Sequence, residues 1–370
     1  MTAPTTRAED LLCDFIRFPT QQASGTHAGG DETALCRHLA KLLEARSADE
    51  IVVETAPRTD GSTGAFVFAR WGAPKLVINA HVDTVPANAG WTRDPWTPHV
   101  DRDGGRLYGL GSADTKGAIA AALVALERIG PPRDCAVLFS GDEEAGSAVM
   151  RAFLDRPAAR GIERVIICEP TARRAGIAHR GVVSQRAELR GPGGHSSKAD
   201  REPKPMVQLA RFAVALDELG RRRLDDGPPG MTGTCLNIAA LEGGVAFNVI
   251  PARAELIWSI RPYPGFDRAG WDADLTAAAR AIDPGIAIES AFYHEPFACD
   301  ALADRVRPFV REVGTLDFWT EAALFGARGI DAIVVGPGDI AQAHAADEFV
   351  AVDDLAWATD LFAALLAGAR

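Results

Sequence analysis

The chain has 370 residues, 47% of them hydrophobic and 24% charged, which is an ordinary globular composition and long enough for two domains. Its formal net charge of −11 argues against a surface for nucleic acid or for an anionic membrane. The polar N-terminus lacks the apolar core of a signal peptide, and no apolar run approaches the roughly 20 residues that span a bilayer. We therefore expect a cytoplasmic protein with neither a membrane nor a nucleic-acid partner.

The cysteines favour the same compartment. They are scattered, form no C-x-x-C pair and mostly fall inside apolar or helical patterns, so we expect buried free thiols and no disulfide framework. They are Cys13, Cys36, Cys135, Cys168, Cys235 and Cys299.

The first half of the chain alternates helical patterns with short apolar runs. We expect helices at residues 7–18, 32–46, 114–127 and 145–154, and strands at 51–53, 65–68, 76–78, 136–139 and 165–168. All-apolar strands that alternate with helices are typical of an α/β domain whose mostly parallel sheet is covered on both faces.

After Gly181 the strand pattern changes to alternating apolar and polar residues. We expect strands at residues 184–190, 235–241, 252–260 and 286–292, with helices at 205–219 and 271–282. This βαββαβ order is typical of a ferredoxin-like module. An apolar strand at 332–335 and a helix at 353–368 resume the pattern of the first half of the chain. The sequence thus predicts one domain from residues 1–180 and 297–370, with a second domain inserted at 181–296.

Histidines and acids follow the buried strands. His81 and Asp83 come after one strand, Glu143 and Glu144 after another, and Glu169 after a third. Asp114 follows a glycine turn, and His344 follows the strand at 332–335. Ligands of open α/β sheets bind at the carboxyl ends of the strands, so we expect these side chains to converge. Nitrogen and oxygen donors without thiolates suit Zn²⁺ or a similar divalent ion.

Each residue alone has an ordinary interpretation. The three acids at 142–144 could form a solvated turn that caps a helix, and a lone histidine is more often structural than a ligand. Because histidines or acids follow several buried strands, one site shared by these residues is favoured. In the segment His81-x-Asp83 both side chains face one side of an extended chain, so Asp83 can hold the second nitrogen of the imidazole.

These motifs resemble the M20 family of zinc aminoacylases and carboxypeptidases over nearly the whole chain. The resemblance lies in the segments at 79–86 (NAHVDTVP), 109–117 (GLGSADTKG), 140–146 (SGDEEAG) and 168–171 (CEPT). The segments at 259–265 (SIRPYPG) and 336–344 (GPGDIAQAH) are similar to acetylornithine deacetylases. The segment at 317–322 (DFWTEA) is similar to acetylcitrulline deacetylases.

The resemblance implies one or two Zn²⁺ ions, which Co²⁺ can replace. One metal would lie on His81 and Glu169 and a second on Glu144 and His344, with Asp114 bridging. Glu143 would then be the general base and acid for attack by a metal-activated hydroxide. The family also has a cis peptide bond at the position of Asp114–Thr115.

The inserted domain would serve as a lid and as the dimerisation domain. In the segment at 191–197 (GPGGHSS), His195 would reach the active site of the partner subunit in a homodimer and stabilise the oxyanion. The alternative interpretation of His195 is a histidine in a loop exposed to water. Asn248 and Arg261 match positions that hold substrate, and the Arg261 fork suits an α-carboxylate. The alternative for Arg261 is a surface ion pair.

One departure puts the substrate side chain in doubt. Many family members carry an arginine shortly after an acid near the last strand, whereas this chain has Glu321-Ala322-Ala323-Leu324. Glu321 could meet a cationic ornithine side chain, although related sequences with neutral substrates also keep a Glu there.

We therefore predict removal of the acetyl group from N2-acetyl-L-ornithine or N-acetyl-L-citrulline, a reaction of arginine biosynthesis. A succinyl-diaminopimelate desuccinylase or a dipeptidase remains an alternative. A dinucleotide-binding dehydrogenase is disfavoured because Asp114 stands where the third glycine would be. A serine hydrolase lacks its G-x-S-x-G motif. A metal-free binding module is disfavoured by the complete set of ligands.

Overall fold

The computed structural model describes residues 7–23, 29–130 and 132–368. Its contacts form two compact units. Unit 1 comprises Met1–Ile177, Cys299–Thr315 and Thr320–Arg370, and unit 2 comprises Ala178–Ala298 and Leu316–Trp319. The inserted segment was expected at 181–296. Residues 316–319 join unit 2 because the Trp319 ring contacts that of His294 and its indole N–H donates to the Glu295 carbonyl.

The central sheet of unit 1 has the order β1-β2-β6-β3-β7-β17-β8. Its strands are Glu50–Pro57 (β1), Thr63–Trp71 (β2), Leu76–His81 (β3), Cys135–Ser140 (β6), Arg164–Ile167 (β7), Arg174–His179 (β8) and Asp331–Val334 (β17). The pairs β3–β6, β3–β7 and β7–β17 are parallel, and the outer pairs are antiparallel. The predicted, mostly parallel α/β sheet is confirmed.

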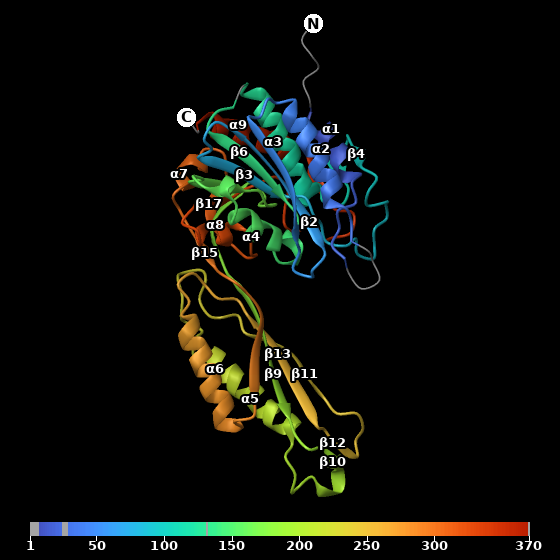
Figure 1. Cartoon of the computed structure of the whole chain (residues 1–370), viewed down its shortest axis with the longest axis vertical. Coiled ribbons are helices and arrows are strands. Elements are labelled where there is room, and N and C mark those ends of the chain that lie inside the picture. Colours follow the sequence, from blue (N-terminus) through green and yellow to red (C-terminus); the bar gives the residue numbers. More distant parts are fainter. Residues whose placement is uncertain (1–6, 24–28, 131, 369–370) are drawn as a thin grey trace. The chain divides into compact units, whose positions relative to one another are not determined.

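Alternation along β2 separates the two faces of this sheet. Ala65, Val67 and Ala69 join a core with four helices, while Phe66 and Phe68 contact the ring of Phe153 from α4. In Figure 1, α1, α2, α3 and α9 lie together on the first of these faces, and α4 and α8 lie apart from them. The first face carries Ala8–Ile16 (α1), Glu32–Glu44 (α2), Gly117–Arg128 (α3) and Val352–Ala367 (α9). The second carries Ala148–Leu154 (α4) and Ala322–Gly326 (α8).

Shorter elements complete unit 1 and its connections. The three-stranded sheet β18-β5-β4 was not predicted from the sequence. Such strands of three residues are fixed by their pairing rather than by local pattern. The bounds are His99–Asp101 (β4), Arg106–Tyr108 (β5), Phe349–Ala351 (β18), Phe297–Ala298 (β15), Glu312–Leu316 (β16) and Ala303–Val306 (α7).

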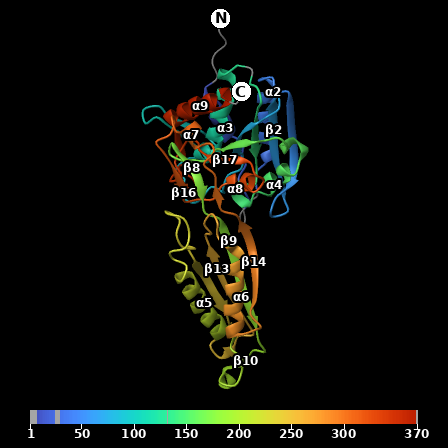
Figure 2. The same cartoon turned by 90° about the vertical axis from the view of Figure 1, so that its left-hand side faces the viewer.

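Unit 2 contains the predicted ferredoxin-like arrangement. Its antiparallel sheet has the order β11-β13-β9-β14. Helices α5 and α6 cover one face, where Phe212, Trp258 and Trp271 are fully buried (Figure 2). The elements are Val182–Arg190 (β9), Pro205–Arg221 (α5), Asn237–Gly243 (β11), Arg253–Ile260 (β13), Arg268–Ile282 (α6) and Ala287–His294 (β14). Strand β11 thus begins two residues later than expected.

A small ribbon in unit 2 was not predicted. Gly194–His195 (β10) pairs with Val249–Ile250 (β12), with His195 opposite Val249. The pairing joins two segments more than 50 positions apart, and each strand is too short to show a sequence pattern. The ribbon brings the segments of His195 and Asn248 together.

Candidate metal centre and active site

Four neighbouring parallel strands carry the predicted ligands to one edge of the sheet in unit 1. His81 is the last residue of β3, and Glu143 and Glu144 form a turn of 3-10 helix three residues beyond β6. Glu169 follows β7 by two residues, and His344 lies in the loop after β17. The strand order β6-β3-β7-β17 makes these strand ends adjacent.

Three of the predicted ligands form a compact cluster. Donor atoms of His81, Asp114 and Glu144 all lie within 4.8 Å of one another. His81 Nε2 is 2.9 Å from Asp114 Oδ1, and His344 Nε2 is 2.9 Å from Glu144 Oε1 and 3.4 Å from Asp114 Oδ2. Asp114 therefore lies between the two imidazoles, and its peptide bond to Thr115 is cis, as expected.

Asp83 supports two parts of the cluster. Its Oδ1 is 3.5 Å from His81 Nδ1, but the nearer partner of this nitrogen is the Asp83 backbone carbonyl at 2.9 Å. The carboxylate also accepts the backbone N–H groups of Glu143 and Glu144, at 3.2 and 3.1 Å. The sequence indicated the first contact and gave no sign of the second. Asp83 is fully buried and fixes both the imidazole and the turn that follows β6.

The electrostatics of this edge favour bound positive charge. Burial raises the pKa of Glu143, Glu144 and Glu169, and the negative charges of neighbouring carboxylates raise it further. Hydrogen bonds to Asp114 and Glu144 raise the pKa of His344 to about 10. Burial opposes the ionisation of Asp114, but hydrogen bonds from His344 and His81 outweigh it and lower its pKa. A divalent cation would relieve the same repulsion.

The donor set fits a metal ion such as Zn²⁺. The cluster offers imidazole nitrogens and carboxylate oxygens as ligands. The second ring nitrogen of His81, Nδ1, has the Asp83 carbonyl as its acceptor, and this contact fixes the tautomer. Glu169 is 7% exposed but is not among the donors that lie within 4.8 Å of one another, so its place in the ligand set stays a prediction. The residues present can therefore hold one or two ions.

Glu348 is a functional residue that the sequence analysis missed. Its buried carboxylate accepts the backbone N–H groups of Gly111 and Ala113 at 2.8 Å each and of Asp114 at 3.1 Å. It thereby ties the turn that carries Asp114 to the segment that carries His344. An acid beside the apolar strand β18, four residues after a predicted ligand, is the signal that could have revealed it.

Glu321 lies beneath the cluster. It is 1% exposed, and Ser140 Oγ is 3.5 Å from its Oε2. Burial raises the pKa of Glu321 to about 8, and its charge raises the pKa of both Glu143 and Glu169. The raised pKa favours the neutral carboxylic acid, and contact of Glu321 with a substrate side chain stays a prediction.

The predicted lid residues His195 and Asn248 lie on the ribbon of unit 2. The N–H of Ser197 donates to His195 Nδ1 at 3.2 Å, and the N–H of Ser196 donates to the Asn248 carbonyl at 3.1 Å. Because Nδ1 accepts, the neutral imidazole carries its proton on Nε2. The exposed His195 ring can therefore donate a hydrogen bond from Nε2.

Arg261 is exposed at the end of β13 in unit 2. Within the described ranges its guanidinium forms no hydrogen bond or ion pair, so the alternative interpretation, a surface ion pair, is not observed there. Its backbone is held firmly. Its N–H donates to the Thr234 carbonyl at 2.7 Å, and its carbonyl accepts from the guanidinium of Arg180 at 2.9 Å. An arginine whose backbone is held in place and whose guanidinium is unpaired is suited to bind an anionic ligand.

Comparison with known proteins decides the family. The profile of Peptidase family M20/M25/M40 matches residues 77–368. This chain belongs to that family. The resemblance noted in the motifs is confirmed, and the M20 chain is a hydrolase of a metal-dependent family.

Three relatives of the M20 chain are two deacetylases and a desuccinylase. It is 40% identical to N-acetyl-L-citrulline deacetylase of Xanthomonas campestris pv. campestris, covering 82% of this chain and 84% of the relative. It is 31% identical to acetylornithine deacetylase of Proteus mirabilis (92% and 91%). It is 34% identical to succinyl-diaminopimelate desuccinylase of Stenotrophomonas maltophilia (77% and 81%).

A solved structure has the same fold. An M20 family metallo-carboxypeptidase from Sulfolobus solfataricus matches with a TM-score of 0.76 at 17% identity, covering 98% of this chain and 99% of the other. Among the described residues, no helix is both long and apolar enough to cross a membrane.

Proposed function

We propose that this M20 chain is a zinc-dependent deacetylase of the cytoplasm that hydrolyses N2-acetyl-L-ornithine or N-acetyl-L-citrulline. The observation that carries the proposal is the cluster of His81, Asp114 and Glu144 in a chain 40% identical to an N-acetyl-L-citrulline deacetylase. The cluster supplies the chemistry, and the relative suggests the substrate class.

In this proposal the metal residues divide into two sets that share Asp114. His81 and Glu169 hold one ion, and Glu144 and His344 hold the other. Zn²⁺ or Co²⁺ at these positions would lower the pKa of a water molecule and polarise the acyl carbonyl. Asp83 and Glu348 keep the ligands in place through the contacts described above.

Glu143 is the proposed general base and acid. Its neighbour Glu144 is directed to His344. The Glu143 carboxylate can then take a proton from the attacking water and pass it to the leaving amine. The raised pKa of Glu143, caused by burial and by nearby carboxylates, suits a group that must both accept and return a proton. Removal of the acetyl group as acetate leaves the free α-amine.

The residues of unit 2 would bind the substrate. The Arg261 fork would pair with the α-carboxylate, and Asn248 would add a hydrogen bond. His195 would donate from Nε2 to the developing oxyanion, a contact that preorganised donors make most effectively. Glu321 would contact the substrate side chain.

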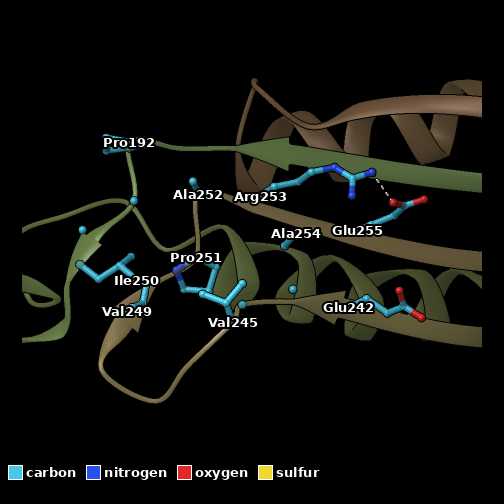
Figure 3. A pocket seen from close by; sticks show the side chains of 14 residues that line it. Pro192, Glu242, Val245, Val249, Ile250, Pro251, Ala252, Arg253, Ala254 and Glu255 are labelled. Atoms are coloured by element: carbon cyan, nitrogen blue, oxygen red, sulfur yellow. Dashed lines mark hydrogen bonds and ion pairs between the residues drawn. The ribbon is translucent and has the colours of Figure 1, made fainter.

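We further propose a homodimer in which His195 serves the partner's active site. Edge strand β11 and the loop after it expose Ile238, Leu241, Val245 and Phe247, of which Phe247 is 99% exposed. Figure 3 shows a pocket of about 590 Å³ in the same region, lined by Val245, Val249 and Ile250 on its apolar side. An unpaired apolar edge next to a pocket favours burial against another copy.

A release assay tests the substrate proposal. Purified protein with added Zn²⁺ or Co²⁺ would receive acetylornithine, acetylcitrulline, acetylmethionine and succinyl-diaminopimelate. We expect the highest kcat/KM for acetylornithine or acetylcitrulline. A higher value for the succinyl substrate would favour the desuccinylase, which is the second candidate because a relative of that name is 34% identical. Cleavage of dipeptides alone would contradict a deacetylase.

A further inference from the structure

A buried ion pair lies behind the turn that carries Glu143 and Glu144. Arg58 Nη2 is 2.5 Å from Glu32 Oε1, and the two side chains are 3% and 1% exposed. Burying two charges carries a desolvation penalty, and an apolar pair of similar size is often equally stable or more so. The pair therefore needs a reason beyond stability, and its remaining hydrogen bonds indicate one.

Glu32 holds the first residues of this turn. Its Oε1 accepts the N–H of Asp142 at 3.3 Å, and its Oε2 accepts the N–H of Ala65 at 2.9 Å. The backbone of Gly141 closes so tightly on the carboxylate that a Cβ there would lie 1.8 Å from Oε2. The carboxylate thus joins β2 to the residues that lead from β6 to the predicted base.

Gln22 links this carboxylate to Asp83. Its amide nitrogen donates to Asp83 Oδ2 at 2.6 Å and lies 3.4 Å from Glu32 Oε1. Asp83 in turn accepts the N–H groups of Glu143 and Glu144. The turn is therefore held at its start by Glu32 and at its end by Asp83, with Gln22 between the two carboxylates.

We infer that Glu32, Arg58 and Gln22 are positioning residues that fix the Glu143–Glu144 turn against the metal cluster. The inference rests on the proposed function, which makes Glu143 the base and Glu144 a ligand. The turn places several carboxylates together and includes Asp142 at φ 67°, so repulsion would displace it without these contacts. A shift of about 1 Å in a catalytic group can lower a rate about 100-fold.

The decisive variant replaces the ion pair with an apolar pair, Glu32→Leu with Arg58→Met. The apolar pair leaves no unpaired buried charge, but the N–H groups of Asp142 and Ala65 lose their acceptor, so we expect a folded variant with a moderately lower Tm. We also expect kcat to fall at least tenfold with KM within about threefold, because the acceptors for Asp142 and Ala65 are lost. A folded double variant with the wild-type kcat would overturn the inference, because the pair would then have only a structural role.

Gln22→Met provides a second test that leaves the ion pair in place. We expect lower kcat, weaker Co²⁺ affinity in a spectroscopic titration, and faster amide exchange at residues 142–145. Unchanged values for all three would contradict the inference. Phe362→Leu in the core of α9 is the matched control: it should lower Tm without changing Co²⁺ affinity.

These measurements separate the two proposals. If wild-type protein hydrolysed none of the acyl amino acids, the proposed function would fail. Co²⁺ affinity and amide exchange would still report whether Glu32, Arg58 and Gln22 hold the turn. If the Glu32/Arg58 double variant did not fold, Gln22→Met alone would decide.

Discussion

The two groups of predicted site residues differ in how firmly they are held. In unit 1, His81, Asp83 and Asp114 are buried, and each has at least two polar partners. In unit 2, the side chains of His195 and Arg261 are exposed, and the Arg261 fork has no partner among the described residues. Unit 1 thus holds a preorganised candidate metal site, whereas in the proposed function the groups of unit 2 would gain their partners from substrate or from a second subunit.

Metal removal should have the largest effect, since it acts on the preorganised group. We expect a strong chelator to abolish turnover and to lower Tm, because the carboxylates near Asp114 then repel one another without a cation. Zn²⁺ or Co²⁺ should restore both. Full activity with less than one equivalent of metal by elemental analysis would reject the metal mechanism.

Glu143→Gln should separate chemistry from metal binding. We expect kcat to fall by about 10²–10⁴-fold, the usual contribution of a general acid–base group, while metal content stays constant. The measurement is steady-state kinetics together with elemental analysis. As a control, Glu144→Gln should lower metal content. Wild-type turnover in Glu143→Gln would remove this residue from the mechanism.

His195→Ala tests the contribution of unit 2 to the chemical step. Loss of one oxyanion donor costs about 10²–10³-fold in kcat, and we expect metal content to remain unchanged. Mixing this variant with Glu143→Gln subunits under exchange conditions should restore part of the activity if His195 acts across a dimer. No recovery in confirmed mixed dimers would indicate that each chain uses its own histidine.

Arg261→Ala should give the smallest effect, limited to binding. We expect KM for an acyl amino acid to rise about tenfold or more, because a hydrogen bond to a charged group contributes about 1.5–3 kcal/mol. The corresponding substrate amide lacks the carboxylate, so its KM should change little. Equal changes for acid and amide would argue against the clamp, and Val214→Ala, at an exposed position of α5, is a control in the same unit.

The ligands of the candidate site could be predicted from the sequence, whereas the residues that support them could not. His81, Glu144 and Glu169 were found because they end apolar strands, and the strand order then brings them together. Nothing in the sequence indicated that Glu348, Gln22 and Arg58 support the site, because their partners lie 10 to 237 positions away and are often backbone N–H groups. Such contacts depend on the folded chain path rather than on residue periodicity.

The contact of Glu348 with the Asp114 turn also has a consequence for biosynthesis. These partners are 234 positions apart, so the ribosome must synthesise the chain as far as residue 348 before they can meet. The central strands can pair earlier, since β3 and β6 leave the ribosome long before residue 348. If His344 is a ligand as proposed, the metal ion can bind fully only after this residue has been synthesised, and ribosome-bound fragments that end before His344 should lack high-affinity uptake of Zn²⁺.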